Sequence, residues 1–133
     1  MLKSLCLWLK LCTSITGPAY VIDGDTIVVE NYHVRLWGVD AEELSEPNGP
    51  RAKAYMQFIV GRNNIDCELN GQRSHGRYVG TCYVDVFGSK YKDLGQQIIE
   101  AGYALDCAHY SGGKYRPFEP AGVREKLIQK PYC

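Results

Sequence analysis

The sequence predicts a small, mainly β domain, built as an antiparallel barrel with helices packed against it. The first observation is the order of the predicted elements, which runs strand, strand, helix, strand, strand, helix, helix over 133 residues. The second is the composition, because 45% hydrophobic and 23% charged residues are close to the globular average. A chain of this length forms one domain. It has no Gly-X-Y period, long heptad run or apolar stretch of ~20 residues, which excludes collagen, coiled coils and multi-span membrane proteins.

The first two predicted strands form a hairpin. Residues 20–29 are rich in Val, Ile and Thr, and residues 33–39 continue this pattern after a turn at 30–32. Loop residues 46–50 follow. Pro50 suits the first turn of a helix, apolar side chains recur at helical spacing over 52–60, and Gly61 ends that helix.

A second hairpin and two helices fill the rest of the chain. Residues 64–69 and 78–86 predict two strands around the turn-like stretch 70–76. Residues 87–89 read as a turn. Asp93 and Gln96 have the spacing of a capping box, so we expect a helix from Asp93 to Gly102. After a short strand or loop at 103–108 and a loop at 110–114, a last helix is expected over 121–129.

The charge of the chain is balanced overall but segregated along its length. Fifteen Lys and Arg residues match fifteen Asp and Glu residues, which argues against a polycation that binds nucleic acid by charge alone. Residues 23–46 are acidic, whereas residues 47–92 and 107–133 are basic. An acidic block beside basic blocks suits a site that holds a cation with an anion over it. Ordinary surface patchiness is the alternative interpretation.

The six cysteines indicate disulfides rather than zinc, because none forms a C-x-x-C pair and no Cys/His cluster has zinc spacing. Cys67 and Cys82 lie on two strand-like runs joined by a turn, and are the best pair. Cys107 with Cys133 is a second candidate pair. Free thiols in a reducing compartment are the alternative.

The N-terminus resembles a weak secretory signal. Residues 1–10 have a basic start and a short apolar run that Lys10 interrupts, without a clear cleavage site. An amphipathic lead-in or a misplaced start explains it equally well, and the run is too short to span a bilayer. We therefore divide the chain into an extension, residues 1–17, and a domain, residues 18–133.

Carboxylates that could hold a hard cation occur around the first hairpin. Asp25 in Asp23-Gly24-Asp25 and Asp40 after the second strand come within about two residues of each other if the hairpin turns at residues 31–32. Asp-Gly-Asp alone is also common in plain turns. Glu42 and Glu43 follow, and a carboxylate beside a bound cation can take a proton from an attacking water. A solvated acidic loop is the alternative.

Two arginines and a tyrosine are candidates for binding an anion. Arg35 lies in an apolar strand, so it needs an anionic partner, which is either a nearby carboxylate or a substrate phosphate. Strand alternation puts Arg35 on the face opposite Asp25, so a bulge or curvature must intervene if both serve one site. Arg77 supplies a second guanidinium, and Tyr110 could contact a base or a phosphate.

Taken together, these segments resemble the staphylococcal nuclease (thermonuclease) family. The matching stretches occur in the family's order, over roughly residues 18–130, and are residues 21–26 (VIDGDT), 34–43 (VRLWGVDAEE), 75–77 (HGR) and 94–104, ending EAGYA. Each motif alone is weak and the ordered set is strong. The resemblance implies an OB-fold barrel of five strands with about three helices. It also implies Ca²⁺-dependent hydrolysis of DNA and RNA.

The resemblance assigns roles to eight residues. Calcium would be bound by the carboxylates of Asp25 and Asp40 and by the backbone carbonyl of Ala41. Glu43 would be the general base. The catalytic arginines would be Arg35 and Arg77, and Tyr110 and His75 would lie near the bound nucleotide.

Two departures from the family pattern matter. Glu42 stands where a proline is usual, so it is expected to compete as a base or to add charge to the metal site. His75 stands where a tyrosine commonly precedes Gly-Arg, which is expected to weaken nucleotide affinity.

The resulting expectation is a low-specificity endonuclease that acts as a monomer and prefers single-stranded DNA and RNA. It would be secreted, periplasmic or in the cell envelope, with a cytoplasmic location as the alternative. One rival is a catalytically inactive OB-fold module that binds nucleic acid or protein. Another is a disulfide-linked envelope protein in which the acidic block binds calcium for structure.

Overall fold

The structure is a computed structural model, and it describes residues 14–133. The signal-like segment of residues 1–13, with Cys6 and Cys12, lies outside the described residues. The first strand begins at Ser14, so residues 14–17, which we assigned to the extension, are part of a strand.

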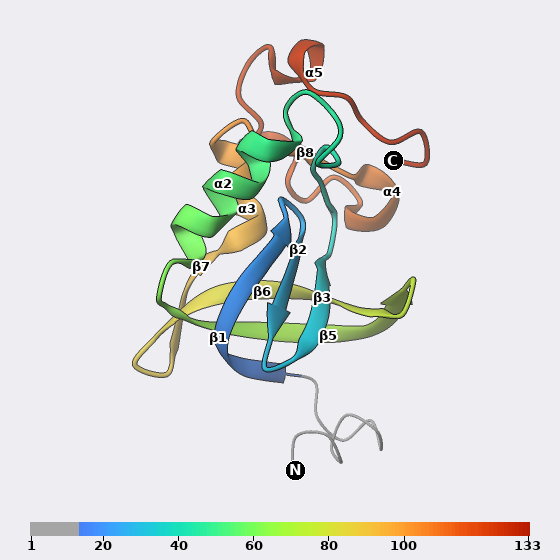
Figure 1. Cartoon of the computed structure of the whole chain (residues 1–133). Helices are drawn as coiled ribbons and strands as arrows, with labels where there is room; N and C mark the ends of the chain where they lie inside the picture. The colour runs from blue at the N-terminus through green and yellow to red at the C-terminus, as the bar shows by residue number, and fades with distance from the viewer. Residues whose placement is uncertain (1–13) are drawn as a thin grey trace.

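Five strands form a closed ring, which confirms the predicted mainly β fold (Figure 1). Antiparallel neighbours follow the order β3-β2-β1-β5-β6, and β3 then pairs with β6. This closing pair is parallel, whereas we expected an antiparallel barrel. The ring strands are β1 (Ser14–Asp23), β2 (Thr26–Val29), β3 (Tyr32–Leu36), β5 (Asn64–Ser74) and β6 (Arg77–Val86).

Three short strands lie outside the ring. The strand β7 (Ser89–Asp93) adds to the edge of β6 through a Phe87-Gly88 turn, and we had not predicted it. The other two, β4 (Val39–Asp40) and β8 (Leu105–Asp106), pair with each other. The β4–β8 pair matters for function because it brings the acidic segment after β3 against the C-terminal third of the chain.

Four α-helices and a 3₁₀ turn lie within the described residues. They are α2 (Gly49–Val60), α3 (Leu94–Glu100), α4 (Ala108–Ser111), η1 (Arg116–Phe118) and α5 (Val123–Lys126). Helix α2 starts with Pro50 in its first turn, as expected, and packs against β1 and α3. None of the described helices has the length and apolar character needed to cross a membrane.

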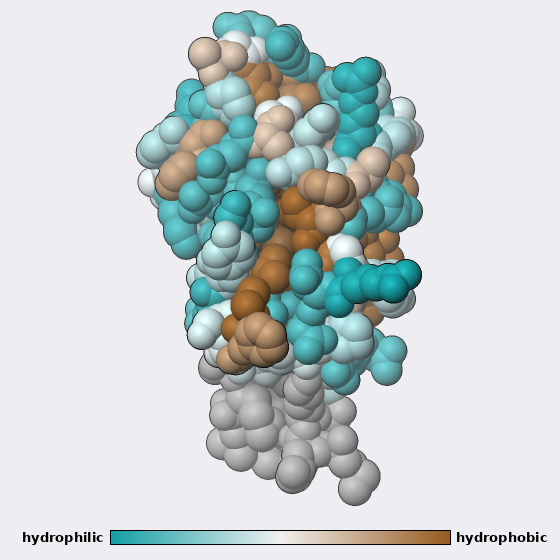
Figure 2. Space-filling model, turned by 90° about the vertical axis from the view of Figure 1, so that its left-hand side faces the viewer, coloured by the Kyte–Doolittle hydropathy of each residue, from teal (hydrophilic) through white to brown (hydrophobic). Residues whose placement is uncertain are grey.

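The core lies between the ring and helices α2 and α3. Its fully buried side chains come from both hairpins and both helices, and include Ile15, Val34, Ile65, Met56 and Ile98. Apolar side chains also reach the surface. Figure 2 shows a narrow hydrophobic stripe that runs through a largely hydrophilic face.

The first hairpin differs from the sequence prediction in its register. The predicted strand 20–29 is divided by a turn at Gly24-Asp25 into β1 and β2. The hairpin between β2 and β3 turns at Glu30-Asn31, whose φ angles of 51° and 70° suit a two-residue turn. Asp25 therefore stands opposite Leu36, whose N–H donates to the Asp25 carbonyl at 2.8 Å, because the hairpin turns one residue earlier than the turn at residues 31–32 that we assumed.

Two helix predictions need correction. The carboxylate of Asp93 caps α3 through the N–H groups of Gly95 and Gln96, but the Gln96 side chain bonds Glu100 and does not complete a capping box. The last helix covers only Val123–Lys126, because Leu127 is extended and the chain beyond it bonds elsewhere.

Two disulfides are present among the described residues, and both pairs are those we favoured from the sequence. Cys67 and Cys82 face each other across β5 and β6. Cys107, just after β8, binds Cys133 and so fastens the C-terminus beside α4.

Candidate active site

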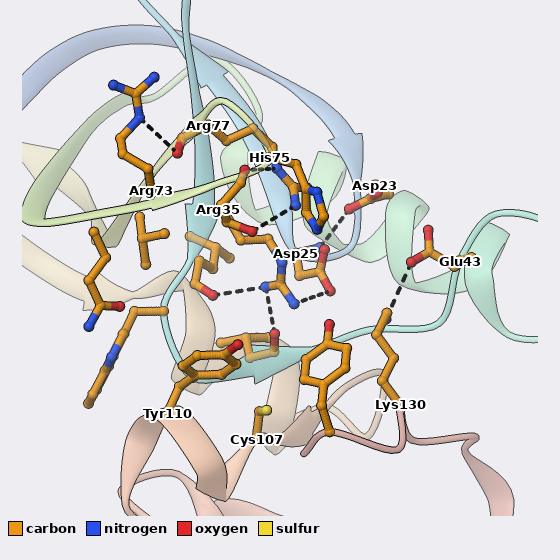
Figure 3. Close-up of a pocket in the computed structure, with 18 residues that line it drawn as sticks. Asp23, Asp25, Arg35, Glu43, Arg73, His75, Arg77, Cys107, Tyr110 and Lys130 are labelled. Carbon is orange, nitrogen blue, oxygen red and sulfur yellow. Dashed lines mark hydrogen bonds and ion pairs between the residues drawn. The ribbon is translucent and has the colours of Figure 1, made fainter.

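One pocket of about 390 Å³ collects most of the candidate residues (Figure 3). It lies where the turn between β1 and β2, the end of β3 and the start of β6 meet the C-terminal segment. Six of the eight predicted site residues line it, and they are Asp25, Arg35, Glu43, His75, Arg77 and Tyr110. The remaining two, Asp40 and Ala41, lie under Lys130 and do not reach the pocket wall.

Asp25 is the most deeply connected carboxylate of the pocket. It is 5% exposed, accepts the N–H of Ala41 at 2.9 Å, and accepts the Thr26 hydroxyl at 3.3 Å. Burial raises the pKa of Asp25 to about 6, although the Arg35 guanidinium opposes that rise. The position is well suited to a second cation, because bringing positive charge to a buried carboxylate removes the main cost of ionising it.

Arg35 meets Asp25 despite the opposite parity that strand alternation predicts. The two side chains form an ion pair of 3.2 Å, and the Arg35 guanidinium also donates to the carbonyls of Leu36 and Val39. The contact is possible because Asp25 lies in the turn before β2, where strand alternation does not fix side-chain direction. The two hydrogen bonds use both protons of Nη1, and Nη2 forms the ion pair, so among the described residues no hydrogen bond uses the donors of Nη2 and Nε, which could bind an anion.

Arg77 is connected to Asp25 through one intermediate hydroxyl. Its guanidinium donates to the Thr26 hydroxyl at 3.2 Å, and Thr26 in turn donates to Asp25. Two further bonds, to the carbonyl and the hydroxyl of Ser74, hold the guanidinium at the start of β6. Thr26 thus positions the Arg77 guanidinium relative to Asp25. From the sequence we named Thr26 only as part of the motif at residues 21–26.

Asp40 and Ala41 are brought beside Asp25, but a lysine covers them. The Lys130 ammonium lies 2.7 Å from Asp40 Oδ1 and 2.8 Å from the Ala41 carbonyl oxygen. Burial alone would lower the pKa of Lys130, but Asp40 together with the charges of Asp25 and Glu43 outweighs burial and raises it. We did not predict Lys130. The only sequence signal was Cys133, whose candidate pairing with Cys107 could have brought the C-terminus here.

The two neighbouring glutamates have separate surroundings. Glu43 reaches the pocket with its side chain 56% exposed, and its carboxylate lies 3.4 Å from the Lys130 ammonium. Glu42 is buried, and it accepts hydrogen bonds from Asn48 and from the N–H of Ile128. Glu42 does not line the pocket, so its surroundings favour a role in fixing the chain over the expected competition as a base, and added charge at the metal site stays a prediction.

The outer wall of the pocket offers aromatic and polar side chains. The rings of Tyr110, on α4, and Tyr132 pack edge to face with their centroids 6.1 Å apart, and both residues line the pocket. His75 lies in the turn between β5 and β6 with a φ of 50°. Such groups can contact a base or a phosphate of a bound nucleotide.

The oxygen atoms around Lys130 fit a hard cation. Asp40 and the Ala41 carbonyl already surround a positive charge, for which the ammonium is a stand-in, and Asp25 lies on the other side of Ala41. No group of three or more His, Cys, Asp or Glu side chains within residues 14–133 forms a metal cluster. A bound Ca²⁺ would thus take two carboxylates and one carbonyl from the chain, and water for the rest of its six to eight oxygens.

The closed ring of five strands with helices packed against it is consistent with an OB-like domain, and one pocket beside the ring collects carboxylates and guanidinium groups. Residues 33–121 match the family described as Staphylococcal nuclease homologue. Because the match covers most of the chain, the chain belongs to the staphylococcal nuclease family.

The chain is also similar to several longer proteins, two of which are named as a nuclease or an endonuclease. The chain is 37% identical over 112 residues to the succinoglycan biosynthesis protein ExoI of Rhizobium meliloti. The matched region covers 76% of this chain and 56% of that protein. It is 30% identical over 95 residues to the probable staphylococcal-like nuclease CAN1 of Oryza sativa subsp. japonica, over 71% and 26% of the two chains. It is 24% identical over 111 residues to the probable endonuclease lcl3 of Sclerotinia sclerotiorum, over 79% and 42%. The chain therefore spans between about a quarter and a little over half of these relatives.

Proposed function

We propose that the protein is a Ca²⁺-dependent endonuclease that hydrolyses DNA and RNA phosphodiester bonds with low sequence specificity. The observation that carries the proposal is that Asp25, Arg35, Glu43 and Arg77, distant in sequence, line one pocket. Membership of the staphylococcal nuclease family supports it, as do relatives named as nucleases.

The acid–base role in this proposal belongs to Glu43. Asp25, Asp40 and the Ala41 carbonyl would hold Ca²⁺, which when bound would polarise the scissile phosphate and offset its charge. Glu43 is exposed enough to reach a water molecule in the pocket, and its carboxylate would remove a proton from that water as it attacks phosphorus.

The two arginines would stabilise the charge that develops on the phosphate oxygens. Arg35 is held by an ion pair with Asp25 and by hydrogen bonds from Nη1 to two carbonyls, while Arg77 is held by Ser74 and Thr26. Donors fixed in advance in this way do not have to reorganise during the reaction, and each is often worth ~10²–10³ in rate.

Single-stranded nucleic acid is the preferred substrate in this proposal. Tyr110 and His75 at the outer wall suit an unstacked base or a flanking phosphate, which a duplex does not expose. We propose that the chain acts as a monomer and that its products end in a 3′-phosphate, as the resemblance implies.

The two disulfides support a secreted, periplasmic or cell-envelope location, because such bonds persist in oxidising compartments. Cytoplasmic location is the alternative, and a measurement of free thiols on protein isolated from each fraction distinguishes them.

A second candidate function is a catalytically inactive OB-fold module that binds nucleic acid or protein. The ion pair between Lys130 and Glu43 favours it, because the carboxylate that would have to contact the attacking water contacts an ammonium in this structure.

A cleavage assay separates the two candidates. Labelled single-stranded DNA is incubated with the protein in Ca²⁺ or in chelator, and the assay is repeated with Glu43→Gln. The proposal expects cutting in Ca²⁺ alone, reduced at least ~10²-fold by the substitution. Binding without cutting by the wild-type protein would instead support the inactive module.

A further inference from the structure

The C-terminal segment of residues 127–133, here called the C-terminal strap, is fixed across the acidic edge of the pocket. Its backbone N–H groups at Ile128 and Lys130 donate to the carboxylates of Glu42 and Asp40, each at 3.0 Å. Cys133 ends the strap in a disulfide with Cys107, and Figure 1 shows the C-terminus lying beside α4. The strap is therefore held at both ends and at its middle.

Lys130 is the only residue of the strap whose side chain forms an ion pair with Asp40 or Glu43. Its ammonium has three oxygen neighbours, at Asp40, the Ala41 carbonyl and Glu43 (Figure 3 shows the last contact). An ammonium has three protons and no acceptor. Two hydrogen bonds go to Asp40 and Ala41, and Glu43 forms an ion pair with the same ammonium, so all three neighbours of Lys130 are oxygen atoms of the protein.

The neighbours of Lys130 overlap with the atoms that the proposed function assigns to the cation and the base. The Asp40 carboxylate and the Ala41 carbonyl are two of the three groups expected to bind Ca²⁺, and Glu43 is the expected base. Asp40 has a fully buried side chain under the ammonium, so a cation from solvent has no access to it while Lys130 is in place. The lysine and a divalent cation therefore exclude each other.

We propose that the C-terminal strap is an autoinhibitory element whose Lys130 ammonium occupies the cation site and has to leave before Ca²⁺ binds. This inference rests on the proposed function for the identity of the cation. Because one site has two exclusive occupants, the apparent Ca²⁺ affinity equals the intrinsic affinity reduced by the fraction of molecules whose strap is open.

Glu42 and the disulfide set how strongly the strap competes. Glu42 holds Ile128, two residues before the lysine, while the disulfide keeps Cys133 three residues after it. A tethered group has a high effective concentration at its site, so cutting either attachment weakens the lysine relative to free Ca²⁺.

Calcium binding to the metal-free protein, measured by isothermal titration calorimetry, tests the inference without any nuclease assay. Lys130→Met keeps the length of the side chain and removes its charge, and we expect Ca²⁺ to bind at least about tenfold more tightly. Lys130→Arg keeps the charge and should stay near the wild-type affinity. The matched control is Lys126→Met, on α5, which has no ion pair with Asp40 or Glu43 and should leave the affinity unchanged.

The double variant Cys107→Ser/Cys133→Ser supplies a second test if Lys130→Met does not fold. It should raise Ca²⁺ affinity in the same direction, and Cys107 is the one pocket-lining side chain that it changes, so every carboxylate, arginine and lysine of the pocket is kept. Unchanged or weaker Ca²⁺ binding by the folded variants would overturn the inference, as would the absence of Ca²⁺ binding from every variant. Tighter binding without DNA cleavage would uphold the autoinhibitory strap and refute the nuclease function, so the two failures are distinguishable.

Discussion

At the scale of single residues, the pocket depends on buried charges that hold one another in place. Asp25 links Arg35 directly and Arg77 through Thr26, so one carboxylate positions both guanidinium groups. The sequence identified these residue types correctly but could not predict how they meet. Strand alternation predicted that Arg35 and Asp25 lie on opposite faces of the hairpin. The turn at Gly24-Asp25 and the long arginine side chain bring the two together.

Arg35 is predicted to depend on the shape of its side chain as well as its charge. Lysine is a point charge and cannot bond two carbonyls and a carboxylate at once while keeping free donors. We expect Arg35→Lys to reduce kcat/KM for single-stranded DNA by about 10²–10³-fold. Arg51→Lys on the exposed side of α2 is the control, and equal activity of the two variants would refute this role.

Glu42 is predicted to stabilise the fold in a pH-dependent way. Burial alone would raise the pKa of Glu42, but hydrogen bonds from Asn48 and Ile128 outweigh burial and lower the pKa below its ordinary 4.5. A lowered pKa in the folded state stabilises the protein above about pH 4.5, and this stabilisation is lost as the pH falls through the folded-state pKa.

Glu42→Gln should therefore lower the free energy of unfolding at pH 7 by about 2 kcal/mol and reduce its decline in acid. Denaturant unfolding between pH 3 and pH 7 in chelator measures both effects. Parallel pH profiles for the wild-type protein and the variant would show that the carboxylate is not the cause.

At the scale of elements, helix α2 packs directly against the loop that carries Glu43, the proposed general base. A Cβ atom on Gly49 would overlap the carbonyl oxygen of Glu43. The start of α2 thus packs directly on the loop that carries the proposed base, and Gly is needed there for close approach.

Gly49→Ala is predicted to reverse the usual effect of this substitution. In an ordinary helix, alanine is favoured over glycine by up to about 1 kcal/mol. Here we expect a loss of about 1–3 kcal/mol in the free energy of unfolding, because the loop has to move, together with lower activity. Thermal melts and cleavage rates are compared with Gln57→Ala on the exposed face of α2. A more stable and fully active Gly49→Ala would contradict the packing described.

Elements with strong local patterns were predictable, and those decided by distant partners were not. Helix α2 follows from its apolar spacing, Pro50 and Gly61. The length of the last helix was overestimated, because the N–H groups of Ile128 and Lys130 donate to two carboxylates about ninety residues away in the sequence instead of continuing the helix. Strand β7 was missed because its residues, exposed or only partly buried, have no alternation of apolar side chains.

At the scale of the whole molecule, the two disulfides have different predicted roles. Cys67–Cys82 closes a separation of 15 residues inside the ring, and both side chains are fully buried. Cys107–Cys133 closes a separation of 26 residues and fastens the strap. We expect the first disulfide to contribute to the stability of the fold alone. We expect the second to affect the Ca²⁺ affinity of the site as well.

Removal of the ring disulfide is predicted to affect stability alone. Cys67→Ala/Cys82→Ala should lower the free energy of unfolding by about 3 kcal/mol, as expected for a loop of this size. Its Ca²⁺ affinity should equal that of the wild-type protein, in contrast to Cys107→Ser/Cys133→Ser. Chemical unfolding and calorimetry on both double variants give this comparison, and Ca²⁺ binding that is tightened as much by loss of the ring disulfide as by loss of Cys107–Cys133 would mean that general loosening is the cause.

The overall architecture and most of the site were predictable because the family motifs occur in order along the chain. Six of the eight expected residues line one pocket, which no single motif guaranteed. Lys130 was not predictable, since neither its spacing nor its neighbours differ from those of a solvated lysine. Its place depends on a disulfide and on two carboxylates that local sequence does not connect to it.

Both the proposed function and the autoinhibitory strap require a divalent cation at Asp25, Asp40 and Ala41, and a crystal structure at saturating Ca²⁺ with its anomalous difference map locates that cation. We expect one Ca²⁺ about 2.3–2.6 Å from oxygens of these three residues, with Lys130 withdrawn from Asp40. Lys130 still bound to Asp40 at saturating Ca²⁺, with the calcium peak elsewhere or absent, would contradict it.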